Sequence, residues 1–154
     1  QVFGEFAHGY RAGAMAFEPF ANLAYVSLRT DGFTESGGAA ALNSRNATTD
    51  ATFTTLGLRA STDIVTGATA TTLRGSLGWR HVLGDTTPLV GMAFASGGSP
   101  FTIAGVPIAE NAAVVDLGLD MKVAPNAMLG ISYGGQFGSY AIDQTIRANF
   151  TAKF

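Results

Sequence analysis

The sequence has no cysteine, only two histidines and a single tryptophan, and few of its residues carry charge. Without cysteine there is no disulfide framework, which excludes the class of small secreted domains held together by disulfides. The net charge of −2 gives no electrostatic reason to expect a nucleic-acid partner. Charged residues make up 13% of the chain, about half the usual share of a soluble domain, whereas hydrophobic residues make up 47%.

Long apolar runs are missing too. The longest candidate, LVGMAFA at 89–95, falls far short of the roughly 20 residues that a membrane helix needs. Transmembrane β-barrels escape this test, because they distribute their apolar residues in alternation and give a much weaker signal per segment. The 154 residues predict one domain, 1–154. The chain begins at Gln1 with neither methionine nor signal peptide, so we expect it to be processed or excised.

Alternation is what the sequence does contain. Near its end, every second residue from Ile146 to Phe154 is apolar and the residues between are polar. Successive side chains of a strand point to opposite faces, so this stretch predicts a strand with one apolar and one polar face. Eight such segments are predicted, separated by Gly, Pro, Asp and Asn: 1–11, 16–30, 52–63, 71–83, 88–96, 111–123, 127–137 and 141–154. The chain is therefore expected to be all-β, an antiparallel up-and-down barrel.

The polar face favours a membrane barrel over a soluble, lipocalin-like barrel that binds a small ligand. Gly57, Gly78, Gly118 and Gly134 lie in mid-strand on this face, where glycine marks close approach or sharp curvature. A crowded polar interior with an apolar exterior is typical of a barrel in lipid. The side chains predicted to form a polar network in the lumen are Glu5, Arg59, Arg74, Arg80, Asp116, Asp120, Lys122 and Arg147. Trp79, Tyr133 and Phe137 are predicted to lie at the membrane interfaces.

No pattern predicts an active site, a metal site or a cofactor. His8 and His81 have no neighbouring acidic or histidine residues at a spacing typical of metal ligands. Asp116 and Asp120 share a strand face about 13 Å apart, too far to act together on one bond. A membrane-barrel lipase or protease would need a nucleophile with a basic partner, and no serine has an identifiable histidine partner in the sequence.

Counting strands back from Phe154 at the periplasmic end predicts the topology. The turn at 138–140 and the loop at 97–111 are expected outside the cell, and the turn at 124–126 on the periplasmic side. The same count places 32–50 on the periplasmic side, although long loops are usually external.

Several phrases of the sequence resemble the C-terminal translocator (β) domain of bacterial autotransporters, the type V secretion proteins. These phrases are EPFANLAYVSLRTDGFTE at 18–35, TTLGLRAS at 54–61, LRGSLGWRHVLGD at 73–85, ISYGGQFGS at 131–139 and the terminal IRANFTAKF. The resemblance covers nearly the whole chain, in the family's order. It implies a bacterial outer-membrane protein that anchors a passenger and helps to export it, without catalysing a reaction. The alternative is a small structural or adhesive outer-membrane barrel with no transport activity.

The resemblance also implies partners. Such domains resemble twelve-stranded barrels, so the eight segments match the last eight strands, and the first strands, a lumen helix and the passenger are expected elsewhere on the same polypeptide. In outer-membrane proteins generally, a terminal aromatic preceded by alternating apolar residues resembles the signal that the barrel assembly machinery reads. Here that signal would be Ile146, Ala148, Phe150, Ala152 and Phe154. Outer-membrane lipid must meet the apolar face, and an open sheet edge in lipid is not tolerated. The strands are therefore a fragment of a larger barrel, close by themselves, or are completed by partner strands.

Overall fold

A computed structural model describes residues 1–66 and 69–153. All its regular elements are strands, as the alternation predicts, and the described residues contain no helix that could cross a bilayer. The strands are β1 (Val2–Ala7), β2 (Tyr10–Ala12), β3 (Met15–Thr30), β4 (Phe33–Thr34), β5 (Leu42–Ser44), β6 (Ala47–Thr66), β7 (Thr69–Gly84), β8 (Leu89–Phe94), β9 (Phe101–Ala104), β10 (Asn111–Ala124), β11 (Ala127–Gly138) and β12 (Ile142–Ala152).

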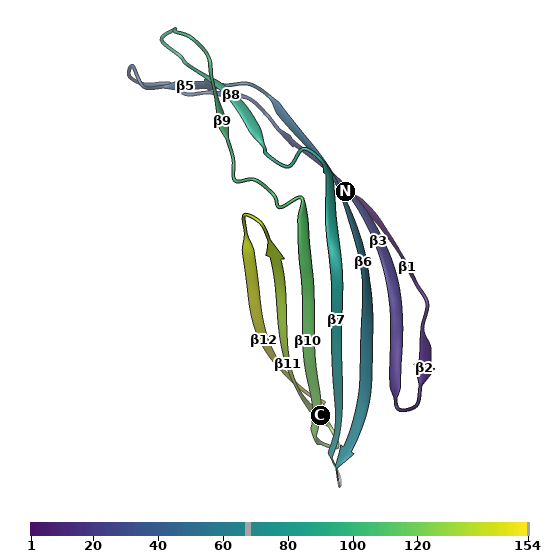
Figure 1. Cartoon of the computed structure of the whole chain (residues 1–154). Coiled ribbons are helices and arrows are strands. Elements are labelled where there is room, and N and C mark those ends of the chain that lie inside the picture. The colour runs from purple at the N-terminus through teal and green to yellow at the C-terminus, as the bar shows by residue number, and fades with distance from the viewer. Residues whose placement is uncertain (67–68, 154) are drawn as a thin grey trace.

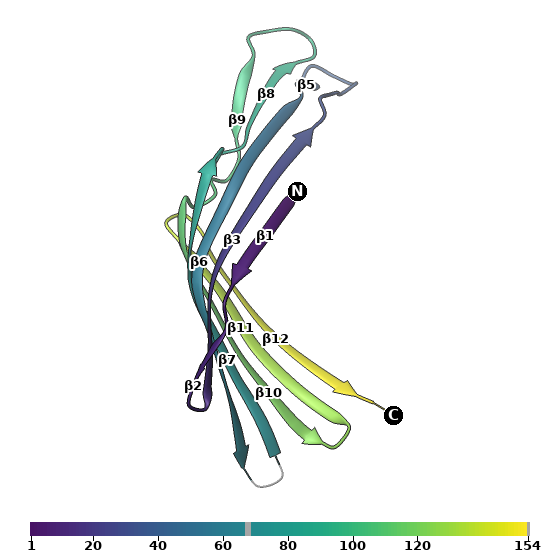
Figure 2. The ribbon, with the colours of Figure 1, turned by 90° about the vertical axis from the view of Figure 1, so that its right-hand side faces the viewer.

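The main sheet is an antiparallel meander in the order β1-β3-β6-β7-β10-β11-β12, with β2 following β1 along the same edge of β3. The sheet is long and strongly curved, with a concave and a convex face (Figure 1, Figure 2). Within the described part of the chain it does not close: β1 and β2 pair only with β3, and β12 pairs only with β11. The prediction of an antiparallel up-and-down arrangement is confirmed.

One predicted strand lies elsewhere. Segment 88–96 forms the six-residue strand β8, which joins β4, β5 and β9 in a separate four-stranded sheet beyond one end of the meander (Figure 1). A membrane-spanning strand needs about 9–11 residues, so β8 is too short to span. The chain leaves the main sheet at Gly84, the last residue of β7, whose positive φ of 103° turns the backbone away before β8 begins. The meander consequently has seven positions, the first shared by β1 and β2.

This difference corrects the predicted topology. The long connections 31–46 and 85–110 lie at the same end of the sheet, whereas the short β2–β3 and β10–β11 turns lie at the other, together with Ala152 of β12. The prediction that 32–50 lies on the periplasmic side with the short turns was therefore wrong, because the count included β8 as a spanning strand. With β8 removed, both long connections are at one end, as expected for external loops.

The large apolar side chains do not form a core. The buried apolar residues among those described are small, namely Ala41, Ala51, Val82, Ala109, Ala112 and Ala127. By contrast, Leu117 is 54% exposed and Phe150 is 65% exposed, both on the convex face. A water-soluble barrel would bury such side chains. The fold thus shows its main apolar surface on the outside.

Candidate functional site

The concave face of the main sheet forms an open groove of about 1170 Å³ that reaches from β1 to β12. Its lining is mixed in charge and rich in glycine, and it includes the residues of the predicted polar network Glu5, Arg59, Arg74, Arg80, Asp116 and Arg147. The ladders explain this convergence, since pairing such as Arg59↔Ser76 and Ser76↔Asp116 places the polar side of each strand in register with the next. The groove brings these charged side chains together and is the candidate site.

At one side of the groove, Arg59 on β6 links three strands. Its Nη1 and Nη2 donate to the two carboxylate oxygens of Glu5 on β1, each at 2.8 Å, and Nη1 also donates to Glu18 Oε1 on β3 at 2.7 Å. Its guanidinium carbon lies 4.0 Å from the centre of the Phe20 ring. These groups are only partly buried, so each pair alone contributes little. The bidentate geometry and the shared guanidinium together fix the edge strand β1 to β6 across β3.

Glycine makes room for this cluster. A Cβ added at Gly57 would lie 2.6 Å from atoms of the Phe20 ring, closer than carbon atoms pack. The ring therefore lies over the bare backbone of β6, where it supports Arg59. The sequence alone gave Phe20 no role, because the contacts of this ring with Gly57 and Arg59 depend on the pairing of β3 with β6.

In the middle of the groove, Arg74 on β7 donates from Nε to Asp120 Oδ2 on β10 at 2.8 Å. It lies across Gly118, where an added Cβ would come within 2.7 Å of Nε. Beside it, the Ser76 hydroxyl donates to Asp116 Oδ2 at 3.2 Å. Two separate hydrogen-bonded pairs, Arg74–Asp120 and Ser76–Asp116, thus lie side by side on the concave face, and of their carboxylates only that of Asp116 belongs to a residue lining the groove.

At the end of the groove nearest the long connections, the side chain of Arg80 on β7 contacts strands on both sides. Its Nη1 donates to Gln136 Oε1 on β11 at 2.7 Å and its Nε to Thr55 Oγ1 on β6 at 3.4 Å. Arg147 on β12 lines the groove, and no carboxylate of the described residues lies within ion-pair distance of it. Lys122 lies on β10, opposite Met128 of β11 in the ladder and close to the short β10–β11 turn. It does not line the groove.

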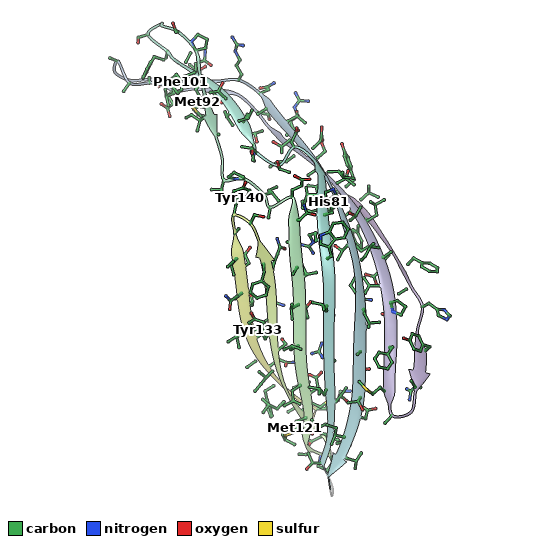
Figure 3. All side chains as sticks on the ribbon, in the orientation of Figure 1. His81, Met92, Phe101, Met121, Tyr133 and Tyr140 are labelled. Atoms are coloured by element: carbon green, nitrogen blue, oxygen red, sulfur yellow. The ribbon has the colours of Figure 1, made fainter. Side chains whose placement is uncertain are left out.

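The predicted interface aromatics lie on the opposite, convex face at two heights. Trp79 and Phe137 occupy one cross-strand row, because both pair with Ala113 of β10. Trp79 also stacks on His81, with ring centres 5.5 Å apart. Tyr133 lies four residues nearer the middle of the sheet, where its hydroxyl donates to Gln144 Oε1 at 3.3 Å (Figure 3). Trp79 and Phe137 are thus placed at one level near the loop end, and Tyr133 is not.

The residues of the predicted assembly signal form the convex face of β12. Ile146, Ala148, Phe150 and Ala152 pair with alternate residues of β11, and Phe154 lies outside the described residues. Sequence reasoning missed Asn126, whose Nδ2 donates to the Lys153 carbonyl at 2.6 Å while its own carbonyl accepts from the Lys153 amide at 2.9 Å. This pair extends the ladder past Ala152. The sequence signal that could have indicated this contact is the asparagine in the turn between β10 and β11.

The described residues contain no group of three or more His, Asp or Glu side chains arranged to hold a metal ion. The charged and polar side chains that line the groove offer hydrogen-bond donors and acceptors along its length.

Comparison with known proteins identifies relatives of the whole chain. The model of the "Autotransporter beta-domain" family matches residues 1–134. Two proteins of Serratia marcescens, each named "Extracellular serine protease", are 38% and 36% identical to this chain over all 154 residues. The chain spans only 15% of the length of either relative.

Proposed function

This chain belongs to the autotransporter β-domain family, and we propose that its concave polar face lines the channel by which an N-terminal passenger on the same polypeptide is exported. Members of this family are outer-membrane proteins of Gram-negative bacteria, so the chain is an outer-membrane translocator domain. The resemblance seen in the sequence phrases is thereby confirmed.

The polarity of the two faces is the observation that carries the proposal. Charged side chains from β1 to β12 line one groove, while Leu117, Phe150 and their neighbours stand exposed on the other face. Turning the strands over would place arginines such as Arg74 against lipid, at about 2–4 kcal/mol each near the bilayer midplane. Only one orientation in a membrane fits this pattern, with the charges facing water.

The passenger is the part of the proposal that depends on the relatives. They are named serine proteases, and this chain matches 15% of their length. We assign any protease activity to the remaining part of such a polypeptide and no reaction to the β-domain.

Closure of the channel needs further strands. The free edges of β1, β2 and β12 would leave unpaired backbone groups in hydrocarbon, at several kcal/mol each. We propose that strands elsewhere on the same polypeptide pair with these edges and complete a twelve-stranded barrel around a lumen helix. The convex face of β12, with Ile146, Ala148, Phe150 and Ala152, is the surface offered to the barrel assembly machinery, together with Phe154.

The proposal is tested in cells that make the complete polypeptide. Surface display of the passenger is measured by antibody binding and by added protease on intact cells, with and without residues 1–154. Loss of display on deletion, with the passenger retained in the periplasm, is the expected result. A passenger that reaches the surface equally well without this domain contradicts the proposal.

A further inference from the structure

The polarity of the two faces reverses in the part of the main sheet that extends beyond the groove towards the long loops. On the concave face, the outermost polar row of the groove is Glu5, Asn22, Thr55 and Arg80, one residue from each of β1, β3, β6 and β7. The next row on the same face, two residues nearer the loops, is Phe3, Ala24, Phe53 and Val82. Beyond it this face continues with Val26 opposite Ala51 and Leu28 opposite Thr49.

On the opposite, convex face, the residues change from apolar to polar towards the long loops. Its row of Val2, Tyr25, Thr52 and Leu83 is still largely apolar. Beyond that row it carries Ser27 and Arg29 on β3, opposite Asp50 and Thr48 on β6. The β3–β6 and β6–β7 ladders run through this region without a register shift, from Met15↔Thr62 to Thr30↔Ala47 and from Thr66↔Thr69 to Ala51↔Gly84. The strands therefore do not turn over. The reversal arises from the sequence: along β3 the large apolar residues change from odd positions, such as Leu23 and Tyr25, to even positions, Val26 and Leu28.

This region stands outside the bilayer. Strand β6 has 20 residues, whereas a spanning strand needs about 9–11. The β3–β6–β7 side of the sheet rises well above β11 and β12 (Figure 2). Phe3 is 72% exposed and Leu28 is 61% exposed on the concave side. An apolar patch of this kind, rimmed by polar residues and surrounded by water, is typical of a surface that binds a partner.

The position of the patch selects the partner. Lipid lies against the convex face, while the patch continues the concave face directly above Arg80 and Glu5. A chain that leaves the groove on the side of the long loops meets this patch first. Most of the length of the relatives lies outside the region matched here, so a long segment remains to make that passage.

We propose that this exit surface, formed by Phe3, Val26, Leu28 and Phe53, binds apolar side chains of the exported segment of the same polypeptide as it emerges in an extended conformation. The inference rests on the proposed export function. An extended chain presents every second side chain to one side, which matches the spacing of successive rows on the exit surface. Because the groove below is polar and the exit surface is apolar, apolar side chains of the passenger gain contacts only after they have left the groove. This difference in binding biases the segment outward.

Site-specific photo-crosslinking in the complete polypeptide tests the inference. A benzophenone-bearing phenylalanine is placed at Phe53, where it replaces one aromatic residue with another, or at Thr52, the adjacent residue on the opposite face. We expect light-induced crosslinks from position 53 to the passenger and none from position 52. In a second experiment the double variant Leu28→Ser/Phe53→Ser is compared with Thr52→Ala. We expect the double variant to display the passenger several-fold more slowly, with the unfolding temperature of the β-domain unchanged.

The outcomes separate this inference from the proposed function. If the passenger is displayed but position 53 crosslinks only to the 95–107 loop of its own domain or to lipid, the inference is wrong and the export function stands. Equal crosslinking from positions 52 and 53 also overturns it, because the contact would then be unspecific. If the unmodified polypeptide displays no passenger at all, both the export function and the inference fall. If Leu28→Ser/Phe53→Ser lowers the unfolding temperature, the crosslinking result alone decides.

Discussion

Arg80 on β7 donates to Gln136 on β11 at 2.7 Å, across the whole width of the intervening strand β10. This contact joins two strands that share no backbone hydrogen bond and holds the guanidinium against the wall of the groove. In the proposed channel, a charge held in this way would keep its place while a polypeptide passes.

Reversing the charge at this position is expected to impair export. Arg80→Glu removes the hydrogen bonds to Gln136 and Thr55, and hydrogen bonds to charged groups contribute about 1.5–3 kcal/mol each. The rate of passenger display and the single-channel conductance should both change. Arg45→Glu, in the connection between β5 and β6, is the matched control and should leave both unchanged. An Arg80→Glu protein that equals the parent in both measurements would falsify a role in the channel.

A side chain at Gly57 is expected to destabilise the sheet. The Cβ of Gly57→Ala would lie 2.6 Å from the Phe20 ring and displace the support of Arg59, and overpacking of this kind costs about 1–3 kcal/mol. Urea unfolding in lipid vesicles measures the change. Gly4→Ala is the control, because nothing lies within 4 Å of an added Cβ there. Equal stability of the two variants would show that the ring moves aside without cost.

Arginine on the convex face is expected to be costly, and arginine on the concave face is not. Leu117→Arg, in the row of Gly75 and Tyr133, should lower the stability in lipid by about 2–4 kcal/mol. Thr145→Arg, which lines the groove on β12, should change it by less than about 0.5 kcal/mol. The same unfolding assay in vesicles compares them. The opposite order of costs would mean that the faces have been assigned the wrong way round.

Asp50 is expected to give a small pH dependence outside the membrane. Hydrogen bonds from Ser27 and then Tyr25 hold the pKa of this carboxyl below its usual value. Because the folded-state pKa is the lower one, the contribution of Asp50 to stability is present above the unfolded-state pKa of about 4 and is lost as the pH falls through the folded-state pKa. The difference in unfolding temperature between the parent and Asp50→Asn should therefore be constant near neutral pH and shrink below about pH 4. A difference that persists unchanged at pH 3 contradicts this assignment.

Removal of the Asn126 side chain is expected to loosen the end of β12. Asn126→Ala loses the bond to the Lys153 carbonyl, a net loss of about 1 kcal/mol. The Lys153 amide should then exchange its hydrogen faster, while amides in the middle of β12 such as Ile146 stay protected. Exchange that accelerates along the whole strand would indicate general destabilisation instead.

The alternation of apolar and polar residues was sufficient to predict the long strands of the main sheet and their two faces along the groove, because period two is a local property of the chain. It did not predict the short strands β4, β5 and β9. It could not separate β8 from the spanning strands, since Leu89–Phe94 has the composition of a strand and only its length and the turn at Gly84 set it apart. The partners within the groove also escaped prediction. Arg80 and Gln136 are 56 residues apart in sequence, and their meeting depends on the register of two ladders, which no local pattern contains.

The scarcity of large buried side chains has a consequence for how this sequence can vary. A packed protein interior constrains the volume and shape of each residue, because neighbouring side chains are fixed. Fluid hydrocarbon has no fixed shape, so positions such as Leu117 and Phe150 are held to an apolar character and not to a size. Exchanges among Leu, Ile, Val and Phe should accumulate freely on the outer surface, and the glycines beneath Phe20 and Arg74 should be the positions that cannot drift.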